Sequence, residues 1–210
     1  MNTQSLKVPN DLSEIRLSDY QKFVKIAEKD QETDFLHKKM IEIFCHIPLD
    51  QVSTYSFNSV KKVIEVLTNM LDQKPKLKTT LKIHDKDYGF IPKLDDMSFG
   101  EYADLDILIA DWETMDQAMA VLYRPITNKF KNKYLIEDYD SDKTAYMGNM
   151  TLDYVFGSLF FLKNLNQELS KHILHYSAKM SNKLTRAQKD HFLSNMDSGH
   201  PFTQLQKVTY

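Results

Sequence analysis

The stretch YGFIPKLDDMSFGEYADLDILIADWETMDQAMAVLYRPI, residues 88–126, carries the most specific local signals in the chain. Tyr88–Ile91 is aromatic and apolar, and the proline that follows removes a backbone donor, so a strand should end there. Ser98 and Glu101 have the spacing of a capping box, in which each side chain accepts a hydrogen bond from the other residue's amide. We therefore predict a strand and then a helix that begins after Ser98.

A second short helix is predicted after Asp111, whose side chain can cap it. Its apolar stripe consists of Met115, Ala118, Met119 and Leu122. Trp112, the only tryptophan, is expected to pack near the corner between the two helices. Ser98, Glu101 and Trp112 are therefore assigned structural roles.

Arg124 and Pro125 are expected to mark the end of the second helix. A proline disfavours helical geometry in the residue before it. An arginine at a helix end can bond the last carbonyl groups and a nearby carboxylate such as Asp104 or Asp106. Both Arg124 and Pro125 are therefore predicted to be structural, and replacing Arg124 should lower stability.

Outside this stretch, apolar residues recur at helical spacing in four longer segments. These are Tyr20–Ala27, Phe35–Phe44, Val60–Leu71 and a segment from Leu152 to about Lys179. We predict a single helical domain over residues 1–180 with a hairpin inserted in it. Residues 181–210 are expected to form a short helix, capped by Thr185, and an extended C-terminal tail.

Strand signals are confined to short stretches. Leu77–Ile83 contains threonines and an alternating pattern that suits a strand. The polar run His84–Asp87 can form a turn, and Tyr88–Ile91 can form the returning strand, which predicts a β-hairpin near residues 78–91. Tyr134–Ile136 is a further short strand, and the extended N-terminus is expected to add to the hairpin. The predicted fold class is mainly α (α+β), a helical bundle with a small β-hairpin.

Composition argues against several classes of protein. The formal net charge is −2, so no global field attracts nucleic acid. The longest apolar run is far shorter than a membrane span, and the first ten residues, MNTQSLKVPN, are polar. The single cysteine, Cys45, fits a reducing compartment. We expect a cytoplasmic protein that binds neither nucleic acid nor a membrane.

One acidic segment resembles a calcium loop but departs from it at two positions. Asp138, Asp140 and Asp142 stand at the first three ligand positions. The turn position that needs glycine holds Lys143, and the twelfth position holds Asn149 instead of glutamate. An acidic surface loop is the favoured interpretation.

Other chemical signals are equally incomplete. His172 and His175 are three residues apart on an expected helix, without a placed carboxylate or cysteine to complete a zinc site. Cys45 adjoins His46, but sequence neighbours rarely form a nucleophile–base pair, and a buried thiol is favoured. We therefore predict no catalytic residue, no metal and no cofactor.

Three segments offer apolar residues to a protein partner. Met115 and Met119 can repack against different surfaces, although their spacing also suits a core. Phe160 and Phe161 belong to a helix with more apolar surface than a single neighbour can cover. Phe202 lies in the tail, which can strengthen docking by adding a strand. These five residues are the predicted partner-binding set.

Four motifs follow one another along residues 13–165. They are I-x-L-x-x-Y-Q from Ile15 to Gln21, GF-I-P at 89–92, GEY-x-DLD at 100–106 and A-x-LYRP at 120–125. Together with YLIEDYD at 134–140, they resemble a set of small uncharacterised proteins from tailed bacteriophages. The resemblance implies a role in phage morphogenesis, and it carries over no catalytic residue.

Three hypotheses about function remain open. The favoured one is a non-catalytic tail assembly chaperone, which would bind another phage protein, such as a tape-measure protein, in the host cytoplasm. The first alternative is a virion structural component of head, neck or tail, which would use similar surfaces for permanent contacts or self-association. The second alternative is an unrecognised enzyme, which would need a polar cluster in a cleft.

Overall fold

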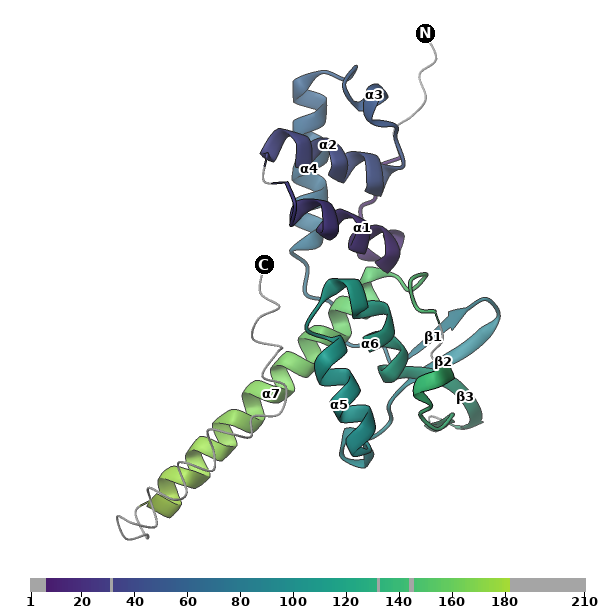
Figure 1. Ribbon diagram of the computed structural model, residues 1–210, viewed down its shortest axis with the longest axis vertical. Coiled ribbons are helices and arrows are strands. Elements are labelled where there is room, and N and C mark those ends of the chain that lie inside the picture. The colour runs from purple at the N-terminus through teal and green to yellow at the C-terminus, as the bar shows by residue number, and fades with distance from the viewer. Residues whose placement is uncertain (1–6, 31, 132, 144–145, 182–210) are drawn as a thin grey trace.

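The computed structural model describes residues 7–30, 32–131, 133–143 and 146–181 (Figure 1). Its α-helices are α1 (Leu17–Ala27), α2 (Thr33–Cys45), α3 (Leu49–Val52), α4 (Phe57–Leu71), α5 (Phe99–Leu108), α6 (Met115–Leu122) and α7 (Leu152–Ser181). Its strands are β1 (Thr80–Ile83), β2 (Lys86–Phe90), β3 (Tyr123–Phe130) and β4 (Lys133–Ile136). The predicted fold class, mainly α with a small sheet, is confirmed.

The helices form two groups on either side of the start of α7. Helices α1 to α4 pack against one another, and α5 packs against α6 beside the sheet (Figure 1). The first turns of α7 contact both α1 and the 3-10 helix η1 (Leu12–Glu14). The beginning of α7 therefore joins the N-terminal helices to the rest of the molecule.

The four strands form one antiparallel sheet in the order β1-β2-β3-β4. The predicted hairpin forms β1 and β2, and its two-residue turn has positive φ at both His84 (46°) and Asp85 (64°). Such a turn matches the right-handed twist of the flanking strands. The sheet is larger than the predicted hairpin, because β3 and β4 pair with it. Helices α5 and α6 lie between β2 and β3 in the chain.

Two expectations about strands were wrong. From residue 7 on, the described N-terminal residues add no strand to the sheet, and Arg16 forms an isolated bridge with Thr151. Arg124 and Pro125 do not end a helix but lie inside β3, since α6 ends at Leu122 and Tyr123 is already extended. The extended geometry that proline imposes on the preceding residue here continues a strand instead of simply stopping a helix.

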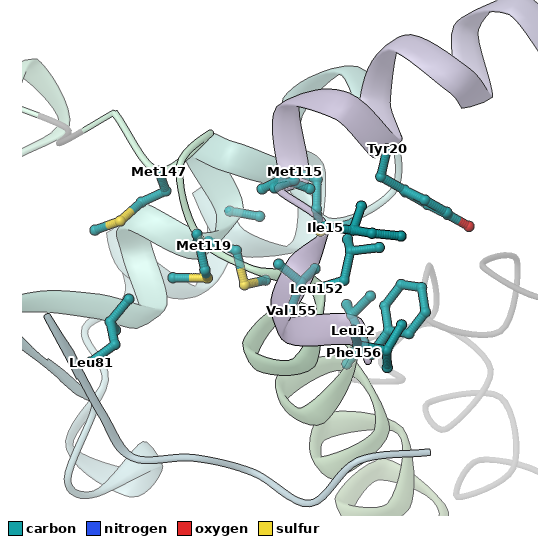
Figure 2. Packing of buried hydrophobic residues seen from close by; sticks show 14 of the residues in the cluster. Leu12, Ile15, Tyr20, Leu81, Met115, Met119, Met147, Leu152, Val155 and Phe156 are labelled. Atoms are coloured by element: carbon teal, nitrogen blue, oxygen red, sulfur yellow. The ribbon is translucent and has the colours of Figure 1, made fainter. Parts of the chain in front are cut away.

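The core lies where the start of α7, α6 and η1 meet (Figure 2). Its fully buried side chains include Leu12 and Ile15 near the N-terminus, Met115 and Met119 on α6, and Val155 on α7. Met115 and Met119 are each 0% exposed, so they are core residues and present no surface to a partner. Helix α6 is enclosed on almost every side, which explains why both methionines are inaccessible.

Trp112 packs at the corner before α6, as expected. Its ring lies 4.8 Å from that of Tyr20 and 6.2 Å from that of Phe156, both in edge-on geometry. Tyr20 and Phe156 also contact each other, with ring centroids 5.6 Å apart. The three rings link α1, the segment before α6 and α7, and such pairs add to the stabilisation from burial alone.

The capping box predicted at the start of α5 is confirmed. The amide of Glu101 donates to Ser98 Oγ at 3.2 Å, and the amide of Ser98 donates to Glu101 Oε2 at 2.6 Å. Replacing Ser98 with alanine should lower the free energy of unfolding by about 0.5–2 kcal/mol, the usual cost of losing an N-cap. Urea denaturation measures this change, and an unaltered midpoint would show that the cap contributes nothing.

Candidate binding surfaces

An apolar groove of about 540 Å³ lies between α2 and α4, and Val52, Ser53 and Tyr55 also line it. Phe57, Val60 and Ile64 of α4 line it at positions i, i+3 and i+7. Phe57 is 79% exposed, whereas Val60 and Ile64 are half-buried. This arrangement leaves a short apolar stripe of α4 accessible from outside.

The accessible stripe adjoins the face that α4 buries, since Val60 and Ile64 are partly buried and pack against the core. Val63, Leu67 and Met70 point into the core and are almost completely buried. One apolar face is enough to anchor an amphipathic helix. The exposed part of the stripe is Phe57, which extends the apolar face of α4 beyond the core and into the groove.

A second pocket, of about 740 Å³, lies where the segment Lys74–Leu77 crosses α7. Phe160 and Phe161 line it, and each is partly buried. Phe161 contacts Phe90 of β2, with ring centroids 5.8 Å apart, so only part of its ring faces the pocket. The pocket brings together two of the predicted partner-binding residues.

Gly157 allows the segment 74–77 to lie directly on α7. A Cβ built at this glycine would stand 2.7 Å from the carbonyl oxygen of Lys76, closer than real Cβ contacts come. The backbone of the segment therefore forms a fixed wall of the pocket. Any larger residue at position 157 would push this wall away from Phe160 and Phe161.

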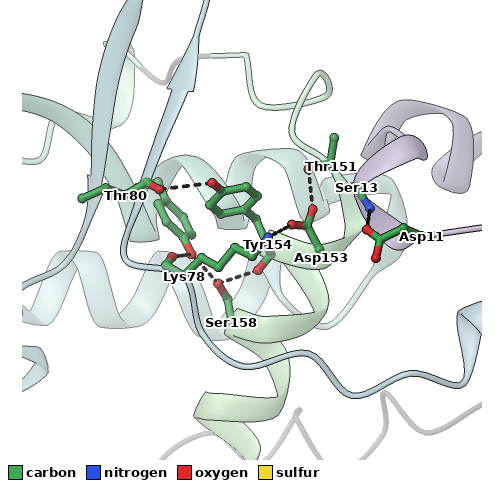
Figure 3. A network of polar contacts seen from close by, with 9 residues as sticks. Asp11, Ser13, Lys78, Thr80, Thr151, Asp153, Tyr154 and Ser158 are labelled. Atoms are coloured by element: carbon green, nitrogen blue, oxygen red, sulfur yellow. Dashed lines mark hydrogen bonds and ion pairs between the residues drawn. The ribbon is translucent and has the colours of Figure 1, made fainter.

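A polar network holds the next residues of the segment on α7 (Figure 3). Lys78 pairs with the buried carboxylate of Asp153, which also accepts from the Thr151 hydroxyl. The hydrogen bond to Asp153 raises the pKa of the Lys78 ammonium group. Tyr123 donates to the carbonyl oxygen of Lys78 at 2.7 Å and lies 2.9 Å from the Ser158 hydroxyl.

A third pocket, of about 840 Å³, is polar and lies between α5, β3 and the segment after β4. The Arg124 guanidinium lines it and pairs with Glu101, with Nη1 and Oε1 2.7 Å apart. Arg124 thus pairs with Glu101 instead of with Asp104 or Asp106, which corrects the expectation. The reason is that Arg124 lies in a strand that passes the first turn of α5, not at a helix end.

Tyr139 and Asp104 form the other polar contact of this third pocket. The Tyr139 hydroxyl donates to Asp104 Oδ2 at 2.6 Å. Burial and the neighbouring carboxylate raise the pKa of Tyr139 to about 12. At neutral pH the phenol therefore keeps its proton and works as a hydrogen-bond donor.

Cys45 is buried at the end of α2, and burial raises the pKa of its thiol to about 11. The thiolate is the reactive form, so this environment is the opposite of what a nucleophilic cysteine needs. Within the described part of the chain, no three His, Cys, Asp or Glu side chains gather in a way that could hold a metal ion. The same residues contain no helix with the length and apolar character of a membrane span.

The structure thus separates the predicted partner-binding set. Phe160 and Phe161 lie together at a pocket, Met115 and Met119 lie in the core, and Phe202 lies outside the described residues. Sequence reasoning missed Phe57, which lies just before the predicted helical segment Val60–Leu71. The available signal was the spacing of Phe57, Val60 and Ile64, which extends the apolar face of α4 towards its N-terminus.

Comparison of this chain with protein-family models, with curated proteins and with solved structures gives no match. The resemblance to the phage proteins therefore stays a prediction from the motifs.

Proposed function

We propose that this chain is a non-catalytic protein of bacteriophage morphogenesis that works by binding another phage protein. The order of motifs at 15–21, 89–92, 100–106 and 120–125 supports the setting. The accessible apolar stripe of Phe57, Val60 and Ile64 supports the mode of action. It is the observation on which the proposal rests, because Phe57 is 79% exposed and extends the apolar face of α4 beyond the core.

The occupant proposed for the groove is an amphipathic helix of the partner. The apolar stripe spans residues 57–64 of α4, which corresponds to about two helical turns. Asp34 and Lys38 of α2 lie on one rim, and Lys61 and Glu65 of α4 lie on the other. A helix with a narrow apolar face and charged flanks of both signs complements such a groove.

The role favoured within this setting is a tail assembly chaperone. A chaperone would cover an apolar segment of its partner, such as a tape-measure protein, until assembly removes it. A structural component of head, neck or tail would keep the same contact in the finished particle. Mass spectrometry of purified particles distinguishes the two, because a chaperone is absent and a structural component is present at fixed copy number.

Replacing Phe57 with aspartate should abolish capture of the partner without loss of helix content. Phe57 is 79% exposed, so the change should alter stability by no more than about 0.5 kcal/mol. Phe99 provides a matched control, since it also begins a helix, is 85% exposed and does not line the groove. Phe99→Asp should therefore retain the partner.

A photo-crosslinking residue at position 57 identifies the occupant in infected cells. The proposal expects a crosslink to one phage-encoded protein, at a segment with apolar residues at helical spacing. Equal capture by the Phe57→Asp and Phe99→Asp variants would show that the groove is not the binding site. Crosslinks only to host proteins, in proportion to their abundance, would contradict the phage setting.

A further inference from the structure

The pocket beside α7 has a charge that no other described pocket shares. Lys74, Lys76 and Lys163 line it, and its described lining contains no acidic residue. None of these three lysines forms an ion pair with a residue that the structure describes. Together with Phe160 and Phe161 they form a surface that is both cationic and aromatic. Its complement is an acidic segment that also carries apolar or aromatic side chains.

The chain itself contains such a segment. Residues 137–142, EDYDSD, follow β4, and the side chains of Glu137, Asp138 and Asp142 are exposed. A large apolar side chain precedes the acidic residues, since Leu135 is 63% exposed. This surface has the same mixture of charge and apolar area as the pocket beside α7, but the opposite sign of charge.

The two surfaces lie at opposite edges of the sheet. The segment 74–77 leads towards β1 at one edge, whereas residues 137–142 follow β4 at the other edge. The acidic segment is also held in place, because the Glu137 amide donates to the Pro125 carbonyl at 2.9 Å and Tyr139 bonds Asp104. One copy therefore cannot fill its own basic pocket without breaking these contacts.

We propose that the chain self-associates head to tail, with the acidic segment 137–142 of one copy seated on the basic pocket of the next. Two different surfaces meet in this contact, so it is heterologous. A heterologous contact produces a ring when the rotation between neighbours closes, and a filament when it does not. The proposal does not depend on the groove between α2 and α4, which remains open to a different partner.

A charge swap tests the contact directly. In the first variant, Lys74, Lys76 and Lys163 are replaced with glutamate; in the second, Glu137, Asp138 and Asp142 are replaced with lysine. Each variant alone juxtaposes like charges and should weaken association at least about tenfold, as measured by sedimentation velocity at low salt. A mixture of the two variants restores opposite charges at every contact and should associate again.

Salt and a matched control complete the experiment. Wild-type association should weaken between low and high salt, because exposed charge pairs are screened. Glutamate at Lys7, Lys29 and Lys62 changes the net charge equally but lies away from both surfaces, and this variant should associate like the wild type. A wild-type protein that stays monomeric at about 100 µM and low salt, or a mixture that stays dissociated, would overturn the proposal.

The test is independent of the test of the groove. Phe57→Asp should leave self-association unchanged, and the two charge variants should still capture the partner. If Phe57→Asp captures the partner as well as Phe99→Asp does, the groove proposal alone is wrong. If the mixture of the two charge variants stays dissociated, the head-to-tail contact alone is wrong.

Discussion

Replacing Arg124 with methionine should lower the free energy of unfolding by about 3–5 kcal/mol. The Arg124 side chain is only 13% exposed and that of Glu101 only 8%, and their charged atoms lie 2.7 Å apart. Removing the guanidinium leaves the Glu101 carboxylate buried with a single backbone donor, the Ser98 amide. The loss is large because an uncompensated buried charge costs far more than the ion pair contributes.

A double variant separates the ion pair from its surroundings. Glu101→Gln combined with Arg124→Met removes both charges, so it should be more stable than Arg124→Met alone. Urea denaturation of the single and double variants measures the difference. If Arg124→Met keeps the wild-type midpoint but self-associates or captures its partner differently, Arg124 acts at an interface instead of in the fold.

Phe156→Ala should have an effect of similar size, about 3–5 kcal/mol, because it removes a large buried ring and leaves a cavity. Phe156 is 2% exposed and contacts the rings of Tyr20, Trp112 and Phe160. It belongs to α7, whereas Tyr20 belongs to α1, so the change should loosen the N-terminal helices from the remainder of the fold.

The single tryptophan makes this outcome observable. Trp112 lies 6.2 Å from Phe156, so its fluorescence should report the loss of packing as well as global unfolding. Phe99→Ala is the matched control, since Phe99 is 85% exposed and its truncation should change stability by no more than about 0.5 kcal/mol. Equal stability of the two variants would mean that the aromatic cluster does not hold α1 against α7.

Features that depend on neighbouring residues could be predicted from the sequence. The capping box needs only Ser98, Glu101 and the backbone between them. The hairpin needs a two-residue polar turn between short strands, and the long helices need only a repeating apolar face. Each of these patterns involves only residues that are close in sequence, so the prediction required no knowledge of tertiary contacts.

Features that depend on distant segments could not be predicted. Glu101, Asp104 and Asp106 all lie on α5, and the choice of Glu101 by Arg124 is decided by the path of β3. The burial of Met115 and Met119 likewise depends on how many neighbours enclose α6, which spacing alone does not reveal. The accessible stripe of Phe57 was missed because its exposure depends on the position of α2.

The contact between the start of α1 and the residues just before α7 has a consequence for synthesis. Leu17 and Ser18 donate to the carbonyls of Met150 and Gly148 at 2.8 and 2.9 Å, and Arg16 is bridged to Thr151, about 135 residues later in the chain. At 5–20 residues per second, a ribosome needs roughly 7–27 seconds to make the intervening residues. During that interval Ile15 and Tyr20 lack their covering residues from α7. The nascent helices α1 to α4 therefore expose apolar surface until the last described element emerges, which makes this the period of greatest risk of aggregation.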